Sequence, residues 1–121
     1  MIYHMISQAA WDAAQAAGVV TNDSLARDGF IHCSQRHQVA PVASAYFNGQ
    51  RDILVLRIDP ARLTAELRYE PPQHLKGLPE PSTKEDDMFP HIYGEISLSA
   101  VIDAVPLILH PDGSLTLPDG A

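Results

Sequence analysis

The sequence contains a single cysteine, Cys33, which excludes a disulfide bond within the chain. It is also short of basic residues, because 8 Lys and Arg stand against 15 Asp and Glu and the formal net charge is -7. Phosphate contacts depend on clustered lysine and arginine, so this charge argues against a nucleic-acid partner. No apolar run approaches the roughly 20 residues that cross a bilayer, and the first residues lack the pattern of a secretory signal. We therefore expect a cytoplasmic chain with no membrane partner.

The composition is that of a globular protein. Hydrophobic residues make up 45% and charged residues 19% of the 121 residues. A chain of this length can bury a core without metals or disulfides. No internal repeat is visible, so residues 1–121 are expected to form a single domain.

Local patterns predict the secondary structure. Ser7 is a typical helix N-cap and Gly18 a typical terminator, so a helix is expected between them, with Trp11 packed into the core. Apolar residues at helical spacing predict a second helix from Gln38 to Phe47. A single helical turn is expected at 24–28. Apolar and alternating runs predict strands at residues 1–6, 30–34, 53–58, 67–70, 89–94, 96–109 (interrupted near 106) and 115–117.

Three of these strands carry a histidine beside a hydroxyl or phenol group. The stretch Phe89-Pro-His-Ile-Tyr-Gly94 places His91 and Tyr93 on one strand face. The stretch Gly29-Phe-Ile-His-Cys-Ser34 likewise places His32 with Ser34 and turns the cysteine towards the core. His4 lies in the first strand, next to Tyr3. Unpaired imidazoles are costly to bury separately, so we expect one shared cleft. Its predicted polar members are His4, His32, Ser34, His91 and Tyr93, and its predicted walls are Phe30, Phe89 and Trp11.

Other interpretations of these histidines remain open. Each one could be a structural group with a satisfied hydrogen bond, and together His4, His32 and His91 could ligate a metal in a metal-dependent enzyme, although their spacing shows no metal signature. Residues 71–87 are rich in proline and acidic residues and are expected to form a long loop, either a lid over the cleft or a solvated excursion. His37, His74 and His110 are expected to be exposed.

Glu70 ends a predicted strand just before this loop. A carboxylate there could bind a substrate, or it could form a surface ion pair with Arg68 or another arginine.

The blocks Ile2-Tyr-His4, Gly29 to Ser34 and Phe89 to Gly94 together resemble a family of small bacterial proteins of an uncharacterised-domain class. That family looks like a branch of the ADP-ribosyltransferase fold. The resemblance implies an α+β fold of two small packed β-sheets with two main helices, and NAD held in the cleft between the sheets. It also implies a chain that binds a small NAD-like or ADP-ribose-like ligand and acts as an ADP-ribosyl transferase.

The order of blocks is similar to that of the transferases that remove a 2'-phosphate from RNA. On this likeness His4 binds the dinucleotide ribose, with Ser34 and Tyr93 as further ligand contacts. His32, His91 and Glu70 are then the candidate catalytic residues. This sequence departs from the pattern in two ways: Met5-Ile6-Ser7 follows His4 where Gly-Thr is usual, and either Glu70 or Glu95 could be the catalytic carboxylate. A binding module that uses the same histidine cleft without turnover is the alternative. The sequence does not specify the oligomeric state.

Overall fold

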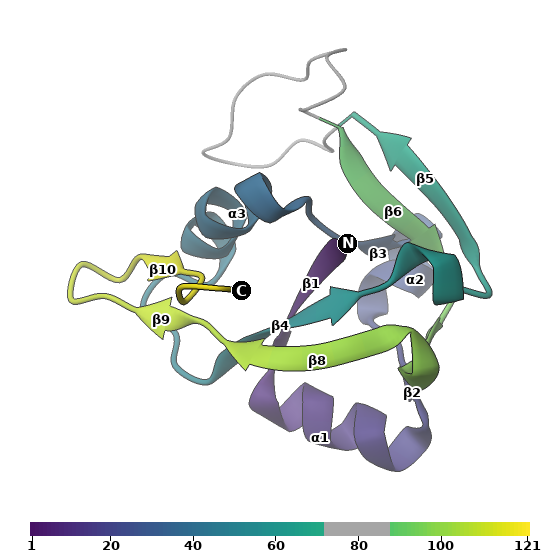
Figure 1. Cartoon of the computed structure of the whole chain (residues 1–121), viewed down its shortest axis with the longest axis horizontal. Helices are drawn as coiled ribbons and strands as arrows, with labels where there is room; N and C mark the ends of the chain where they lie inside the picture. The colour runs from purple at the N-terminus through teal and green to yellow at the C-terminus, as the bar shows by residue number, and fades with distance from the viewer. Residues whose placement is uncertain (72–87) are drawn as a thin grey trace.

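The computed structural model of the chain describes residues 1–71 and 88–121 (Figure 1). The helices there are α1 Gln8–Ala17, α2 Asp23–Asp28 and α3 Val39–Tyr46, with 3-10 turns η1 Arg36–Gln38, η2 Pro60–Arg62 and η4 Leu98–Ala100. The strands are β1 Ile2–Ser7, β2 Val19–Val20, β3 Ile31–His32, β4 Ile53–Ile58, β5 Glu66–Glu70, β6 Phe89–Tyr93, β7 Ile96–Ser97, β8 Val101–Pro106, β9 Ile108–Leu109 and β10 Leu115–Thr116. The fold class is α+β, as predicted.

Two three-stranded antiparallel sheets carry most of the structure. Their strand orders are β1-β4-β8 and β3-β6-β5, and the pairs β2-β7 and β9-β10 form two small further sheets. Two backbone hydrogen bonds join the larger sheets: Tyr3 N donates to Ser34 O at 2.9 Å, and Ser34 N donates to Tyr3 O at 2.7 Å. We call this pair of bonds the sheet junction. It holds β1, with His4, beside the chain that leaves β3.

The continuous apolar run of β4 is buried on both faces, which confirms the predicted central strand. Leu54 and Leu56 belong to a core cluster that also contains Ala14 of α1. Val55, on the opposite face, packs with Tyr3 and with Val39 of α3. Figure 1 shows α1 and α3 on opposite sides of this sheet. A strand covered on both faces has no solvated side, and this explains why β4 is apolar at every position except Arg57 rather than alternating.

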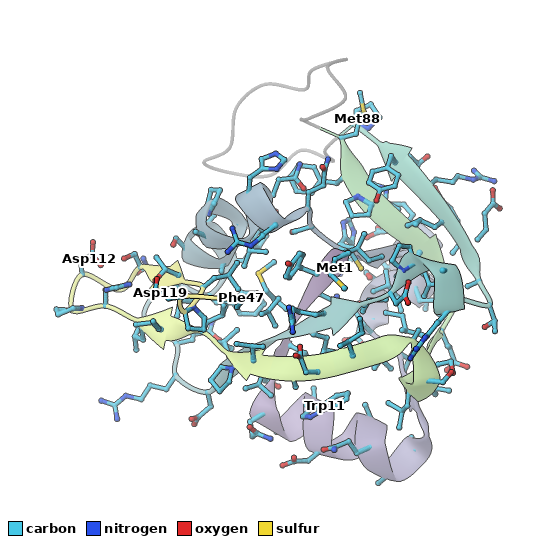
Figure 2. All side chains as sticks on the ribbon, in the orientation of Figure 1. Met1, Trp11, Phe47, Met88, Asp112 and Asp119 are labelled. Carbon is cyan, nitrogen blue, oxygen red and sulfur yellow. The ribbon has the colours of Figure 1, made fainter. Side chains whose placement is uncertain are left out.

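The first helix begins and ends where the sequence indicates. Ser7 Oγ accepts a hydrogen bond from Ala10 N at 3.1 Å, and Gly18 adopts a left-handed conformation with φ 86°. Trp11 is half-buried against the core, on the side of α1 that faces the sheet (Figure 2). The expectation that Trp11 packs into the core is thus confirmed in part, because its ring keeps one side in solvent.

The C-terminal segment forms the expected β9–β10 hairpin, with Gly113 at φ 90° in its turn. One prediction about this hairpin is wrong. His110 is half-buried rather than exposed, because its Nε2 hydrogen-bonds Thr116 Oγ1 at 2.7 Å across the hairpin. His37 is exposed, as expected. The predicted loop or lid at 71–87 lies, apart from its first residue, outside the described residues, as does His74. In the described part of the chain, no helix is both long and apolar enough to cross a membrane.

Candidate functional site

A pocket of about 740 Å³ opens where β1, α2, β3 and α3 meet, and we call it the histidine pocket. Its polar lining residues are His4, Ser7, Thr21, Asn22, Asp23, Ser24, Arg27, Asp28, His32 and Ser34. Its remaining lining residues are Met5, Ile6, Ala10, Cys33, Val42, Tyr46, Phe47 and Phe89. Ligand sites are typically clefts of about 300–1,000 Å³ with apolar walls and a few convergent polar groups. The histidine pocket has both the size and the lining of such a site.

His4 presents a fixed hydrogen-bond acceptor to this pocket. The residue is 3% exposed, and its Nδ1 lies 2.9 Å from the backbone oxygen of His32. Because a carbonyl oxygen can only accept, Nδ1 must carry the proton and Nε2 is left with its lone pair. Burial lowers the pKa of His4 below its ordinary value, although the bond to His32 partly opposes this effect. His4 is therefore neutral near pH 7, with Nε2 available to accept.

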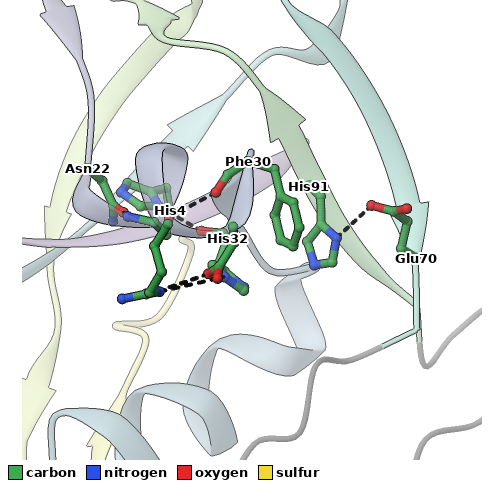
Figure 3. A network of polar contacts seen from close by, with 9 residues as sticks. His4, Asn22, Phe30, His32, Glu70 and His91 are labelled. Carbon is green, nitrogen blue, oxygen red and sulfur yellow. Dashed lines mark hydrogen bonds and ion pairs between the residues drawn. The ribbon is translucent and has the colours of Figure 1, made fainter.

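His32 is held by a carboxylate that comes from α2. Its Nε2 lies 3.0 Å from Asp28 Oδ2, and the His32 side chain is 33% exposed (Figure 3). Hydrogen bonds from Arg27, then from His32, lower the pKa of Asp28 to about 2. Asp28 is therefore ionised at neutral pH and accepts the proton of Nε2. The left-handed Gly29, with φ 86°, turns the chain after α2 so that the two side chains meet.

Ser34 lies on the same side of the pocket, at the sheet junction, and is 1% exposed. Cys33 is 2% exposed and packs into the core, as predicted, and burial raises the pKa of its thiol. The thiol is therefore protonated at neutral pH and a poor nucleophile.

The other predicted site residues form a separate group, which we call the Glu70 cluster. His91 Nδ1 donates to Glu70 Oε1 at 2.9 Å, and the hydroxyl of Tyr93 donates to the same oxygen. The bond from Tyr93, and to a smaller extent the bond from His91, lower the pKa of Glu70. Burial lowers the pKa of His91, which is 2% exposed. The cluster thus consists of an ionised carboxylate that accepts from two neutral donors.

Phe30 lies between the Glu70 cluster and the histidine pocket. Its ring stacks on His91 with centroids 4.0 Å apart and contacts His32 at 4.8 Å (Figure 3). Arg68 does not pair with Glu70, so that alternative is wrong. Its guanidinium binds Glu66 at 2.7 Å and lies 4.5 Å from the centre of the Tyr93 ring. Glu70 instead turns inward, because His91 and Tyr93 offer it two donors at once.

The prediction of a single cleft is therefore confirmed only in part. His4, His32 and Ser34 do line one pocket, although they come from separate strands. His91 and Tyr93 do not line it, and neither do Glu70 and Glu95. Of the predicted aromatic walls, Phe89 is correct, whereas Phe30 and Trp11 lie elsewhere. The alternation of β6 correctly put His91 beside Tyr93, but it could not show that His91 would stack on Phe30 and lie next to His32 without lining the pocket itself.

The metal interpretation has no geometric support in the described residues. Within 1–71 and 88–121, no three His, Cys, Asp or Glu side chains are placed to hold an ion. His4 and His91 each direct Nδ1 at an oxygen of the protein instead of at a common centre.

Several pocket residues were missed by the sequence analysis. Asn22, Arg27 and Asp28 lie on or next to α2, which was recognised only as a helical turn. Tyr46 and Phe47 were counted as the apolar face of a helix, yet both line the pocket, and Tyr46 is 48% exposed. A usable signal existed for one of them: Asp28 stands four residues before His32, with a glycine between them to reverse the chain.

Comparison with known proteins identifies the family. The family model described as "Protein of unknown function (DUF952)" matches residues 5–104. The chain belongs to the DUF952 family. The crystal structure of protein CC0527 from Caulobacter crescentus is similar to this DUF952 chain, with 32% sequence identity and a TM-score of 0.77 over 95% of this chain and 92% of that one.

Two further structures of CC0527 agree with this likeness. The crystal structure of a double mutant has 31% identity and a TM-score of 0.76 over 95% and 92% of the two chains. The solution NMR structure has 31% identity and a TM-score of 0.64 over 93% and 89%. No curated protein matches the chain. The DUF952 fold of this chain is thus an α+β arrangement of small antiparallel sheets and few helices.

Proposed function

We propose that the histidine pocket binds NAD or a related ADP-ribose compound, and that the protein transfers the ADP-ribose group. The observation that carries this proposal is the convergence on a single pocket of His4 from one three-stranded sheet, His32 from the other, and Ser34 from the sheet junction. The resemblance of the sequence blocks to the ADP-ribosyltransferase fold, in which the dinucleotide lies between two sheets, supports the same reading.

The chemistry of the lining fits the sugar and ring parts of such a ligand. A neutral His4 with a bare Nε2 accepts from a hydroxyl or amide donor, and ribose and carboxamide groups both supply one. Tyr46, Phe47 and Phe89 offer apolar and aromatic surface to a flat ring. The diphosphate would face Arg27, the one Lys or Arg among the described lining residues. Because Arg27 also pairs with Asp28 at 3.0 Å, we expect modest affinity.

A non-enzymatic binding module is the second candidate, and the position of Glu70 favours it. Transfer from NAD normally uses a carboxylate near the ribose to steady the developing cation. Glu70 is bound to His91 and Tyr93 outside the pocket lining, and Glu95 is exposed in the turn after β6. Neither glutamate occupies that position.

Calorimetric titration with NAD, ADP-ribose and nicotinamide tests the proposal. We expect a dissociation constant tighter than about 1 mM for at least one of them, equivalent to roughly 4 kcal/mol. His32→Ala should weaken binding at least tenfold. His110→Ala removes a histidine of the β9–β10 hairpin and should leave binding unchanged. If no compound binds more tightly than about 1 mM, the nucleotide proposal is wrong.

A second measurement separates the two candidates. Nicotinamide release from bound NAD can be followed by chromatography, with and without a protein extract as a source of acceptors. Release that depends on the protein and is lost in His32→Ala favours the transferase. Binding with no release over hours favours the binding module.

A further inference from the structure

The carboxylate that contacts a pocket histidine is Asp28. We infer that His32 accepts the proton of the acceptor group in the transfer reaction, and that Asp28 is the positioning residue that prepares His32 for this task. The inference rests on the proposed function and deepens it, because it names the residues that take the place expected for Glu70 or Glu95.

The geometry of the pair is that of a carboxylate-oriented base. Asp28 Oδ2 lies 3.0 Å from His32 Nε2, and both residues line the histidine pocket. Because the carboxylate can only accept, Nε2 carries the proton and Nδ1 keeps its lone pair. Within the described residues, Nδ1 of His32 makes no hydrogen bond in the structure. The His32 side chain is 33% exposed, so a substrate group in the pocket has access to it.

Asp28 is itself held in place. Arg27 binds it through Nη2 at 3.0 Å and through Nε at 3.2 Å. These contacts keep the carboxylate ionised and limit its rotation. An imidazole that gains a proton becomes a cation, and a fixed carboxylate at hydrogen-bond distance stabilises that cation. Asp28 therefore fixes the tautomer of His32.

The other groups that face His32 do not compete for this role. His4 of β1 is neutral and has its Nδ1 bound to the His32 backbone. His91 of β6, whose ring centroid is 5.4 Å away, is also neutral and bound to Glu70. Arg27 and Asp23 are the other charged groups of the pocket lining, and Arg27 contacts Asp28 rather than the imidazole. His32 is thus the imidazole that has both a pocket-facing edge and its own carboxylate.

The step balances without a further reagent. The bond between the ribose C1 and the nicotinamide nitrogen breaks, and its electron pair leaves with nicotinamide, which neutralises the pyridinium charge. An acceptor hydroxyl, or water, forms the new bond to C1 through its oxygen. The proton of that oxygen moves to His32 Nδ1, and the resulting imidazolium, paired with Asp28, later releases it to solvent. With water as the acceptor, the products are ADP-ribose, nicotinamide and one proton.

Asp28→Asn tests the pair, with His32→Gln as the direct change and Asp12→Asn, on exposed α1, as the matched control. Asp28→Asn should leave the dissociation constant for NAD within about threefold. It should lower kcat for nicotinamide release about 100-fold, within the range that general-base catalysis supplies. Asp12→Asn should behave as the wild type.

A readout on the ligand-free protein is independent of turnover. Nitrogen chemical shifts of the His32 ring should show a proton on Nε2 in the wild type and a mixture of tautomers in Asp28→Asn. A proton on Nδ1 in the wild type overturns the inference, as does an Asp28→Asn variant with wild-type kcat. Wild-type protein that binds NAD without releasing nicotinamide overturns the inference and leaves the binding function intact. Failure to bind NAD overturns the inference, and failure to bind any of NAD, ADP-ribose and nicotinamide overturns the proposed function as well.

Discussion

Single replacements of His91 and His32 by alanine distinguish a histidine that stabilises the fold, His91, from one that acts in the pocket, His32. His91 is 2% exposed, donates to the Glu70 carboxylate and stacks on Phe30 at 4.0 Å. A hydrogen bond to a charged group contributes about 1.5–3 kcal/mol, and a ring stack about 0.5–1.5 kcal/mol. We therefore expect His91→Ala to lower the free energy of unfolding by about 2–4 kcal/mol. His32 is one-third exposed, so its ion pair with Asp28 contributes at most about 1 kcal/mol, and with its tilted ring contact to Phe30 at 4.8 Å we expect His32→Ala to cost about 1–2 kcal/mol.

Urea unfolding followed by circular dichroism measures both values. The slope of free energy against urea should be unchanged, so that the shift in midpoint reports stability alone. Calorimetry with NAD on the same samples should show the reverse order of effects, with binding lost in His32→Ala. Equal destabilisation by the two substitutions would refute the division between pocket and Glu70 cluster. If His32→Ala alone fails to fold, then His32 and not His91 is the structural histidine, and the assignment is wrong.

Three further predictions concern stability. Burial lowers the pKa of His4 and His91 in the folded chain. When the pH falls below their ordinary pKa of 6.5, these two histidines therefore bind protons in the unfolded chain but not in the folded one. Stability should fall there by up to about 1.4 kcal/mol per pH unit for each histidine, and a flat profile in urea unfolding from pH 7.5 to 5 contradicts this. Gly94→Ala places a Cβ 2.8 Å from Ala65 Cβ and should lower the free energy of unfolding by about 1–3 kcal/mol. Adding Ala65→Gly should restore part of this loss, and thermal melts of the single and double variants check both effects. Ser24→Ala leaves the buried backbone carbonyl of Phe30 without its donor at 2.9 Å and should lower the free energy of unfolding in urea by about 1–3 kcal/mol. An unchanged midpoint would show that this bond does not contribute to stability.

Elements with local signals were predicted well from the sequence. A cap at Ser7, a glycine at position 18 and a continuous apolar strand at 53–58 are each specified by neighbouring residues, and each lies where expected. The pairing of His91 with Tyr93 on one face of β6 follows from strand alternation in the same way.

The arrangement of the site depended on contacts between distant residues, which periodicity does not encode. Alternation fixes which face a side chain takes, but not what packs on that face. Phe30 stacks on His91 because β3 pairs with β6, and the His91 ring lies 5.4 Å from that of His32 without lining the pocket itself. The role of Asp28 was hidden for another reason. Its short helix has a weak pattern, and the left-handed glycine that aims it at His32 was read only as a terminator.

The sheet junction bears on how freely the pocket can change its shape. In the part of the chain that the structure describes, the backbone hydrogen bonds that join β1 to the chain leaving β3 are the two between Tyr3 and Ser34, and the imidazole of His4 bonds the His32 carbonyl beside them. Within the larger sheets the pairing is longer: β1 and β4 pair along six residues, and β5 and β6 pair along five. The junction thus has the fewest paired residues among the strand pairings that flank the pocket. Local opening draws on such weakly paired regions. Exchange of the Tyr3 and Ser34 amide hydrogens therefore reports whether the two walls separate as rigid halves, at a lower free energy than that of unfolding either sheet.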